Sequence, residues 1–325
     1  MKYNLSWVLK ALITSGLLYY IFNNIPVSEI VPAIASARIH FFAIAFLLVL
    51  LMNYVASGRM KRLTDRQGMT VTRRRIFEIN LIANFYGLFL PGSLAGGAVR
   101  WEKLYKTDKN GVGAFVAIIF NRFILTTATA ATGVIFWALA GNYMSNRAAG
   151  LSLMGILAIL LVLQGAMINR RIFPWVERSL EGKNRMPGIV RSKLRKLTLS
   201  LRQNRDLPLT SLLWLAALSF IEEFLGVVSY YFVSLAIGME VSFVHLGWIR
   251  SCILIVTMLP ISFSGFGVRE GTLIALLAPY GVSGNVAVAF SLLLFARSLL
   301  MAGIGGVLET ANLLFPTNRK AIEEP

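Results

Sequence analysis

Long apolar stretches follow one another along this chain, separated by short polar connections and two basic clusters. A bilayer core about 30 Å thick needs roughly 20 apolar residues per helix. Six uninterrupted stretches meet that length, at about 7–25, 39–58, 111–141, 149–167, 209–237 and 286–315. Two further stretches, 76–99 and 246–280, are apolar but broken by proline and glycine. The pattern predicts an all-α polytopic membrane protein with about 6–8 transmembrane helices.

The first stretch resembles a secretory signal because a lysine precedes it. However, the nearest small-residue cleavage pattern, at residues 35–37, lies well beyond the apolar stretch. We therefore expect this segment to be a retained helix.

Composition narrows the protein class further. The chain has 325 residues, of which 56% are hydrophobic and 14% charged, and its mean hydropathy is +0.68. These values exclude a disordered protein, a small secreted domain and an ordinary cytosolic enzyme. The single cysteine, Cys252, excludes an internal disulfide and a thiolate metal cluster. We expect neither a metal nor another cofactor.

The net charge of +17 is concentrated in two places. Residues 59–75 contain seven basic side chains and one acid, and residues 168–206 contain eleven basic side chains and three acids. Because loops rich in Lys and Arg stay in the cytoplasm, we interpret this charge as a topology signal rather than as a nucleic-acid site. The expectation is a multi-pass protein of a bacterial-type cell (inner) membrane with both termini cytoplasmic.

This orientation has a consequence for the two broken stretches. The connections on both sides of 76–99 are basic, so this segment should enter and leave the membrane on the cytoplasmic side. The connections around 246–280 should lie on the opposite side, since 238–245 is nearly uncharged and the basic tail is inside. Two oppositely oriented re-entrant hairpins of broken helix are predicted.

These assignments divide the chain into four parts. An N-terminal membrane half (1–167) and a C-terminal membrane half (209–315) each contain one hairpin. Between them lies a basic cytoplasmic loop (168–208), either an interfacial amphipathic helix or a solvated loop. Residues 316–325 form a cytoplasmic tail.

The two hairpin segments resemble each other. Residues 90–100 read LPGSLAGGAVR and residues 259–269 read LPISFSGFGVR, with six of eleven positions identical at a constant offset of 169. Glu102 follows the first arginine and Glu270 the second. Two copies of opposite orientation would form an inverted repeat, a common plan of secondary transporters.

The motif residues suit an anion receptor. Proline ends a half-helix, glycine allows close backbone approach, and free amides at a helix N-terminus attract anions. Arg100 and Arg269 follow directly, so each hairpin could hold a phosphate-sized group. Alternatively, the glycines serve only helix packing. The candidate substrate-binding residues are Asn84, Pro91, Gly96, Gly97, Arg100, Glu102 and Arg122 in the first half, and Pro260, Ser264, Gly265, Gly267, Arg269, Glu270 and Arg297 in the second.

Four charged residues fall inside uninterrupted apolar stretches: Arg122, Arg297, Glu222 and Glu223. Each costs roughly 2.5–3.5 kcal/mol at the bilayer centre, so a polar cavity or buried ion pairs are implied. One interpretation pairs a glutamate with Arg122 or Arg297 to fix helix packing. The other has the arginines hold an anionic headgroup while Glu222 or Glu223 exchanges a proton.

Taken together, these motifs resemble the lysyl-phosphatidylglycerol synthase transmembrane region, a flippase-like family. Asn84, the two hairpin motifs, the Gly281-Val282 step and the late Arg297 carry the resemblance, which covers about residues 5–315. In its better known members, the multiple peptide resistance factors, this region moves aminoacylated phosphatidylglycerol between leaflets, and a soluble C-terminal domain makes that lipid. The sequence ends ten residues after Phe315, so we expect a stand-alone form without the synthase domain.

The resemblance and the residues together favour translocation of a phosphate-bearing or otherwise anionic lipid. The alternatives are a secondary transporter of a small anion and a membrane-embedded lipid or glycan transferase. The sequence has no Asp-x-Asp pair and no His-rich site, so we expect a transporter rather than an enzyme. The expected partners are membrane lipids, anionic or polyprenyl-linked, with a second copy of the chain and a lipid-biosynthesis enzyme as further candidates and no nucleic acid.

Overall fold

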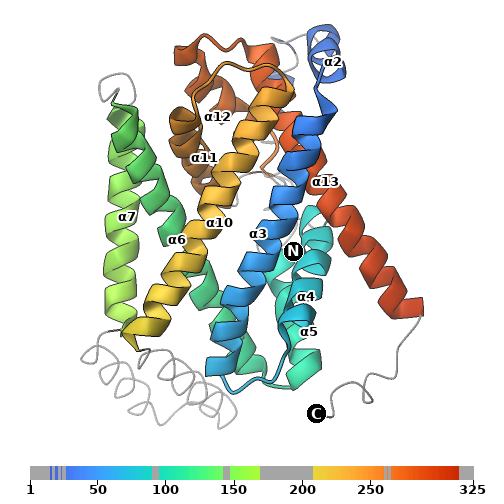
Figure 1. Ribbon diagram of the computed structural model, residues 1–325, viewed down its shortest axis with the longest axis vertical. Helices are drawn as coiled ribbons and strands as arrows, with labels where there is room; N and C mark the ends of the chain where they lie inside the picture. The colour runs from blue at the N-terminus through green and yellow to red at the C-terminus, as the bar shows by residue number, and fades with distance from the viewer. Residues whose placement is uncertain are drawn as a thin grey trace.

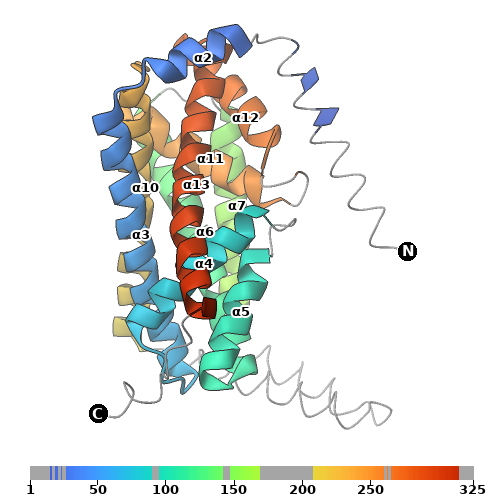
Figure 2. The same ribbon diagram turned by 90° about the vertical axis from the view of Figure 1, so that its right-hand side faces the viewer.

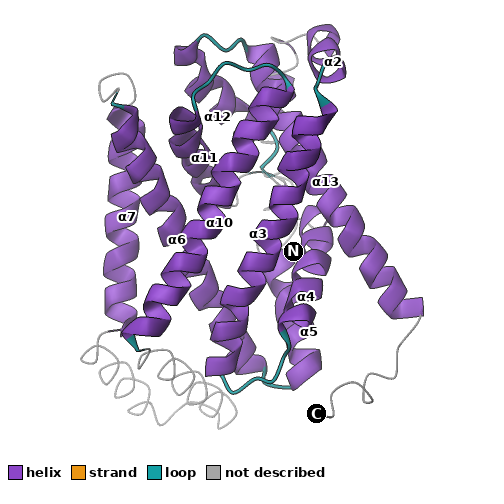
Figure 3. Ribbon diagram, viewed as in Figure 1, coloured by secondary structure: helices purple, strands orange, loops and turns teal. Residues whose placement is uncertain are grey.

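The computed structural model describes residues 27–89, 95–141, 147–168, 208–259, 262 and 265–314, together with positions 15, 16, 19, 20 and 23. Every element in this part of the chain is helical, as predicted (Figure 3). Pro91, Pro260, Ser264, most of the first apolar stretch and the basic loop at 169–207 lie outside the described residues.

Five of the six predicted spans are confirmed as helices long and apolar enough to cross a membrane. Apart from the end of α3, the helix boundaries follow the apolar runs closely, because the bilayer sets the length over which apolar side chains are needed. The five helices are α3 (Ile39–Arg66), α6 (Gly111–Ala140), α7 (Arg147–Ile168), α10 (Leu209–Ala236) and α13 (Gly284–Leu314).

Shorter helices form two hairpins, which lie in opposite halves of the molecule (Figures 1 and 2). The first consists of α4 (Arg73–Phe89) and α5 (Ala95–Asp108), which pack against each other. The second consists of α11 (Phe243–Met258) and α12 (Val268–Leu277), which is followed by the short η1 (Ala278–Tyr280). At 1.5 Å per residue none of these helices reaches the roughly 30 Å of a bilayer core.

Contacts between connections place both ends of each hairpin on one side of the molecule. Before α4, the Thr70 amide donates to Asp108 Oδ2 at 2.7 Å, just before α6. In the other half, the rings of His245 and Tyr280 lie 4.4 Å apart, so the start of α11 touches η1. This geometry suits hairpins that enter and leave by one face. Their insertion into a bilayer as re-entrant segments stays a prediction.

The helices α3 to α6 and α10 to α13 repeat each other in order and in length. Shifting α3 and α4 by 169 residues places them within one residue of α10 and α11 at both ends. The packing repeats too, because α4 lies on α13 and α11 lies on α6. Helices α3 and α10 cross between the units and run in opposite directions (Figure 1). The structure therefore contains the inverted repeat that the motifs predicted.

Each unit has its own apolar core. Trp248 and Phe290 are fully buried among residues of α10 to α13, whereas Met60 and Leu63 pack with residues of α4, α5 and α6. Outside the repeat, α2 (Val27–Ala35) packs on α13 and lies across one end of the bundle (Figure 2). α7 packs on α6. The centre between the two cores is available for polar groups.

Two boundaries correct the sequence interpretation. Residues 59–66, assigned to a basic cytoplasmic loop, continue α3 by two turns. Residues 100–108, also assigned to a loop, are helical and belong to α5. In both cases a helix outlasts its apolar run, because backbone hydrogen bonding and burial of one face stabilise it further.

Candidate functional site

The two motif arginines occupy equivalent places in the repeat. Arg100 lies in the second turn of α5 and Arg269 in the first turn of α12. Before α12 the chain turns through Gly265 and Gly267, whose φ angles of 80° and 78° are unfavourable for residues with a Cβ. Both arginines therefore lie where a hairpin returns toward its own side of the molecule.

In the C-terminal unit, the motif arginine is neutralised within the protein. Arg269 Nη2 lies 3.0 Å from Glu270 Oε1, and its Nε donates to Ser291 Oγ on α13 at 2.7 Å. The other oxygen, Glu270 Oε2, accepts the Gly267 amide at 2.7 Å and caps α12. The Arg269 and Glu270 side chains are only 12% and 4% exposed, so this is a closed ion pair with satisfied neighbours.

The N-terminal unit has no such carboxylate. Among the described residues, neither Arg100 nor Arg122 has a hydrogen-bond or ion-pair partner for its guanidinium, and Arg100 Nε is buried without an acceptor. Helix α5, which carries Arg100, packs on α6, which carries Arg122. This unit therefore carries unbalanced positive charge next to the hairpin.

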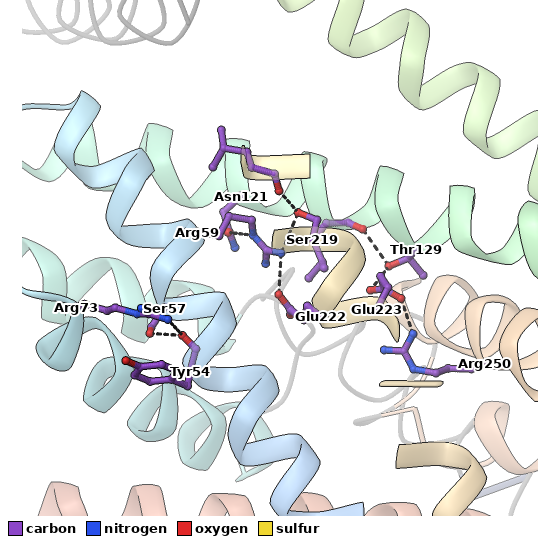
Figure 4. A network of polar contacts seen from close by, with 12 residues as sticks. Tyr54, Ser57, Arg59, Arg73, Asn121, Thr129, Ser219, Glu222, Glu223 and Arg250 are labelled. Atoms are coloured by element: carbon purple, nitrogen blue, oxygen red, sulfur yellow. Dashed lines mark hydrogen bonds and ion pairs between the residues drawn. The ribbon is translucent and has the colours of Figure 1, made fainter. Parts of the chain in front are cut away.

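Two adjacent glutamates on α10 point to different partners at the centre of the molecule (Figure 4). Glu222 forms an ion pair of 2.7 Å with Arg59 of α3, whose side chain is 1% exposed. Glu223 forms an ion pair with Arg250 of α11 and accepts from Thr129 Oγ1 of α6 at 2.8 Å. Because α3 and α6 belong to the N-terminal unit, these contacts connect the two units.

Neutral side chains complete the site around Arg59. Its Nε donates to Asn121 Oδ1 at 2.8 Å and its Nη1 donates to Ser219 Oγ at 3.1 Å (Figure 4). A buried arginine needs such acceptors, because each unsatisfied donor costs free energy. Arg59 is therefore held by two neutral contacts in addition to its ion pair.

Of the two interpretations of the buried charges, the one that pairs Glu222 or Glu223 with Arg122 or Arg297 does not match the structure, because the partners are Arg59 and Arg250. Arg297 instead donates to Ser229 Oγ and lies 5.6 Å from the Tyr230 ring centre. Arg122, predicted as buried, is exposed on α6. Its position is nevertheless central, because Thr126, one turn later, donates to Met258 Sδ at the end of α11 at 3.7 Å.

Several other candidate residues do not belong to the site. Glu102 is exposed and pairs with Lys106 one turn along α5. Asn84 donates to Asn53 Oδ1 at 3.1 Å and joins α4 to α3. Gly96 lies close to the backbone of α4, since an added Cβ would lie 3.1 Å from the Ala83 carbonyl oxygen. Asn84 and Gly96 therefore serve helix packing, and an added Cβ at Gly97 would meet nothing within 4 Å.

Sequence reasoning missed three charged residues of the interior: Arg59, Arg250 and Glu309. Of the three, Arg250 could most easily have been predicted from the sequence, because it is a single arginine within the apolar run of α11. Arg59 was counted with the basic run that follows it. Glu309 accepts from Lys103 Nζ, with its Oε2 at 2.7 Å, and from Tyr86 Oη at 3.2 Å, which ties α13 to α5 and α4.

In the described part of the chain, no group of three His, Cys, Asp or Glu residues could hold a metal ion. The site therefore offers arginine guanidinium groups, hydroxyls and two α10 carboxylates. Such a set suits electrostatic binding of an anion through charge-assisted hydrogen bonds.

The fold and the site define a polytopic helical membrane protein with an inverted repeat and a charged interior. The chain belongs to the family described as "Lysylphosphatidylglycerol synthase TM region", whose model matches residues 7–306. A comparison with curated proteins finds no match.

Proposed function

We propose that this protein translocates a lipid with a phosphate-bearing or otherwise anionic headgroup across the membrane. The observation that carries the proposal is the excess of positive charge among the central helices. Apart from the ion pair of Lys103 with Glu309, six arginines face three glutamates among the described residues there. They are Arg59, Arg100, Arg122, Arg250, Arg269 and Arg297, against Glu222, Glu223 and Glu270.

Unbalanced cations at membrane depth are expensive, so a function must retain them. An anionic headgroup would supply the missing charge while its acyl chains stay in the bilayer. The outer surface fits this arrangement, since large apolar side chains such as Phe115 on α6 and Ile159 on α7 are exposed. Membership of a membrane family often described as flippase-like supports the same class.

The inverted repeat supplies a way to move the headgroup. If the two units rock against each other, the site between them opens to one face and then to the other. The Arg59–Glu222 ion pair joins α3 to α10 and must loosen or reorient in such a movement. The contact of Arg59 with Asn121 on α6, which belongs to the same unit, would hold its side chain meanwhile.

The test is reconstitution of the full chain in liposomes that contain traces of tail-labelled phosphatidylglycerol or tail-labelled phosphatidylcholine. An impermeant reductant then bleaches the label in the outer leaflet. We expect the chain to expose the phosphatidylglycerol label of the inner leaflet faster than protein-free vesicles do. Phosphatidylcholine should exchange more slowly, because its headgroup has no net negative charge.

The matched control is Glu102→Gln, which removes an exposed carboxylate outside the site and should leave exchange unchanged. If no anionic lipid exchanges faster than in protein-free vesicles, the proposal is wrong. Uptake of radiolabelled phosphate or sulfate by the same vesicles without lipid exchange would instead support the small-anion transporter.

A further inference from the structure

We propose that the phosphate group binds in only one of the two units, between Arg100 and Arg122, and that the equivalent place in the C-terminal unit is closed by Glu270. The lipid nature of this ligand rests on the proposed function. The position of the site rests on the structure alone, and the experiment below separates the two.

The comparison between the units is residue for residue. At the offset of 169, Arg100 corresponds to Arg269 and Arg122 corresponds to Ser291. Arg269 and Ser291 are in direct contact, with Nε donating to Oγ at 2.7 Å. The same geometry in the N-terminal unit brings Arg122 toward Arg100, because α5 packs on α6 as α12 packs on α13. Where one unit has an arginine beside a serine, the other has two arginines.

In the C-terminal unit, the carboxylate of Glu270 already occupies the place that an anionic ligand would take. Both carboxylate oxygens of Glu270 are occupied, one by Arg269 and Ser291 and the other by the amide of Gly267. The carboxylate is 4% exposed and caps its own helix. A phosphate group would have to displace this carboxylate and leave it buried without a partner, which costs several kcal/mol.

Among the described residues, the N-terminal place lacks such an anion. Trp101 corresponds to Glu270, but its indole lies on the outer side, where it is 39% exposed and stacks on Tyr105. Glu222 on α10 does not supply it either, because its carboxylate already pairs with Arg59. Two like charges with no anion between them repel each other, so an added anion gains from both.

The chemistry of two guanidinium groups selects the ligand. The planar guanidinium group of arginine can donate two parallel hydrogen bonds to the oxygens of a phosphate group. A carboxylate has only two oxygens and is fully bound by one guanidinium group, whereas a phosphate group can accept from two. Arg122 is exposed and Arg100 Nε is buried, so the first can receive a phosphate group from outside and the second can hold it inside. Phosphate is therefore the ligand class, as a lipid headgroup or as the free ion.

The experiment counts bound lipids on the purified full chain in detergent by native mass spectrometry. Phosphatidylglycerol is titrated in, and a parallel titration adds inorganic phosphate as competitor. We expect one phosphatidylglycerol to be retained by the native chain. The Arg100→Gln and Arg122→Ser variants should each weaken this binding by about tenfold or more, and Arg122→Ser gives the N-terminal unit the residue found at position 291.

The matched control is the double variant R269Q/E270Q. It leaves net charge unchanged, and the amide oxygen of Gln can still accept the Gly267 amide, so retention should equal that of the native chain. Because Arg122 is exposed, its variant should fold even if Arg100→Gln does not, and elution volume and thermal unfolding verify this. Displacement of the lipid by millimolar phosphate shows the site accepts the free ion, and lack of displacement shows that it needs the lipid. Both support a phosphate site.

Unchanged retention in R122S and R100Q, or loss of retention in R269Q/E270Q, would overturn this assignment. Lipid exchange in the liposome assay that persists in R100Q and R122S would overturn it too, yet leave the proposed function standing. Conversely, a single Arg122-dependent lipid without any leaflet exchange would retain the binding site and refute translocation.

Discussion

At the scale of single residues, Arg59 shows that residues with the same charge in one basic run can have different structural roles. It begins a run of seven basic residues that the charge pattern assigns to the cytoplasmic side. Its own side chain is buried at the crossing of α3 and α10 and pairs with Glu222. Nothing in the local sequence separates it from its neighbours. What distinguishes it is Glu222 on α10, a helix far along the sequence that packs directly on α3.

This burial makes a stability prediction. Arg59→Gln should lower the free energy of unfolding by about 3–5 kcal/mol, because Glu222 is left as a buried, uncompensated charge. The double variant R59Q/E222Q should recover most of that loss. Thermal unfolding in detergent, followed by tryptophan fluorescence, measures both.

The control is Arg62→Gln, an exposed residue of the same helix, which should leave the unfolding temperature unchanged. If R59Q/E222Q is as unstable as R59Q, the ion pair does not act as described. A double-mutant cycle then assigns the loss to the contacts of Arg59 with Asn121 and Ser219.

The glutamates also show why part of the site was predictable and part was not. That Glu222 and Glu223 need compensation follows from their place in an apolar run. Which arginines compensate them depends on the crossing of distant helices, and the sequence does not contain that information. Glu102 was misassigned for a simpler reason. It follows its arginine by two residues, whereas Glu270 follows by one, and each residue turns the side chain by about 100°.

At the scale of elements, close packing of α13 on α4 holds the N-terminal hairpin. A Cβ added at Gly305 would lie 2.0 Å from the Leu81 carbonyl oxygen, which is backbone and has little room to move. Small residues allow such close approach between membrane helices. The long helices could be predicted from apolar length, but this contact between α4 and α13 could not.

Gly305→Ala should therefore destabilise the protein by about 1–3 kcal/mol through overpacking, seen as a lower unfolding temperature in detergent. Gly303→Ala is the matched control on the same helix, because an added Cβ there meets nothing within 4 Å. That variant should be as stable as the native chain or slightly more so, since Ala favours helix over Gly. Equal stability of the two variants would contradict the described packing.

At the scale of the whole molecule, the repeat was predicted from six identical positions and is now seen in helix lengths and packing. The Leu-Pro step and the arginine spacing were visible because a broken helix needs particular residues. The opposite orientation of the two hairpins followed from basic residues in the connections. Their position in a bilayer is open to direct measurement.

Cysteine labelling tests that topology. In a Cys252→Ser background, Thr70→Cys and Lys109→Cys mark the two ends of the first hairpin, and Glu240→Cys and Ser283→Cys mark those of the second. All four positions are exposed. In intact cells, an impermeant maleimide should react with the cysteines at 240 and 283, and with those at 70 and 109 only after permeabilisation. Labelling of 70 and 109 from opposite sides would show that α4 and α5 cross the membrane.

The closed ion pair of Arg269 and Glu270 has a consequence for the energetics of the cycle. If both units were identical, the forms open to either face would be related by a twofold rotation and would have equal energy. Because both units belong to one polypeptide, a substitution changes only one of them. The backbones of the two units are related by a twofold axis, but their charges are not, since Arg269 is paired and Arg100 is not. In the proposed transport cycle, the empty chain would accordingly have a preferred resting side, set by its own side chains before any cargo or gradient acts on it.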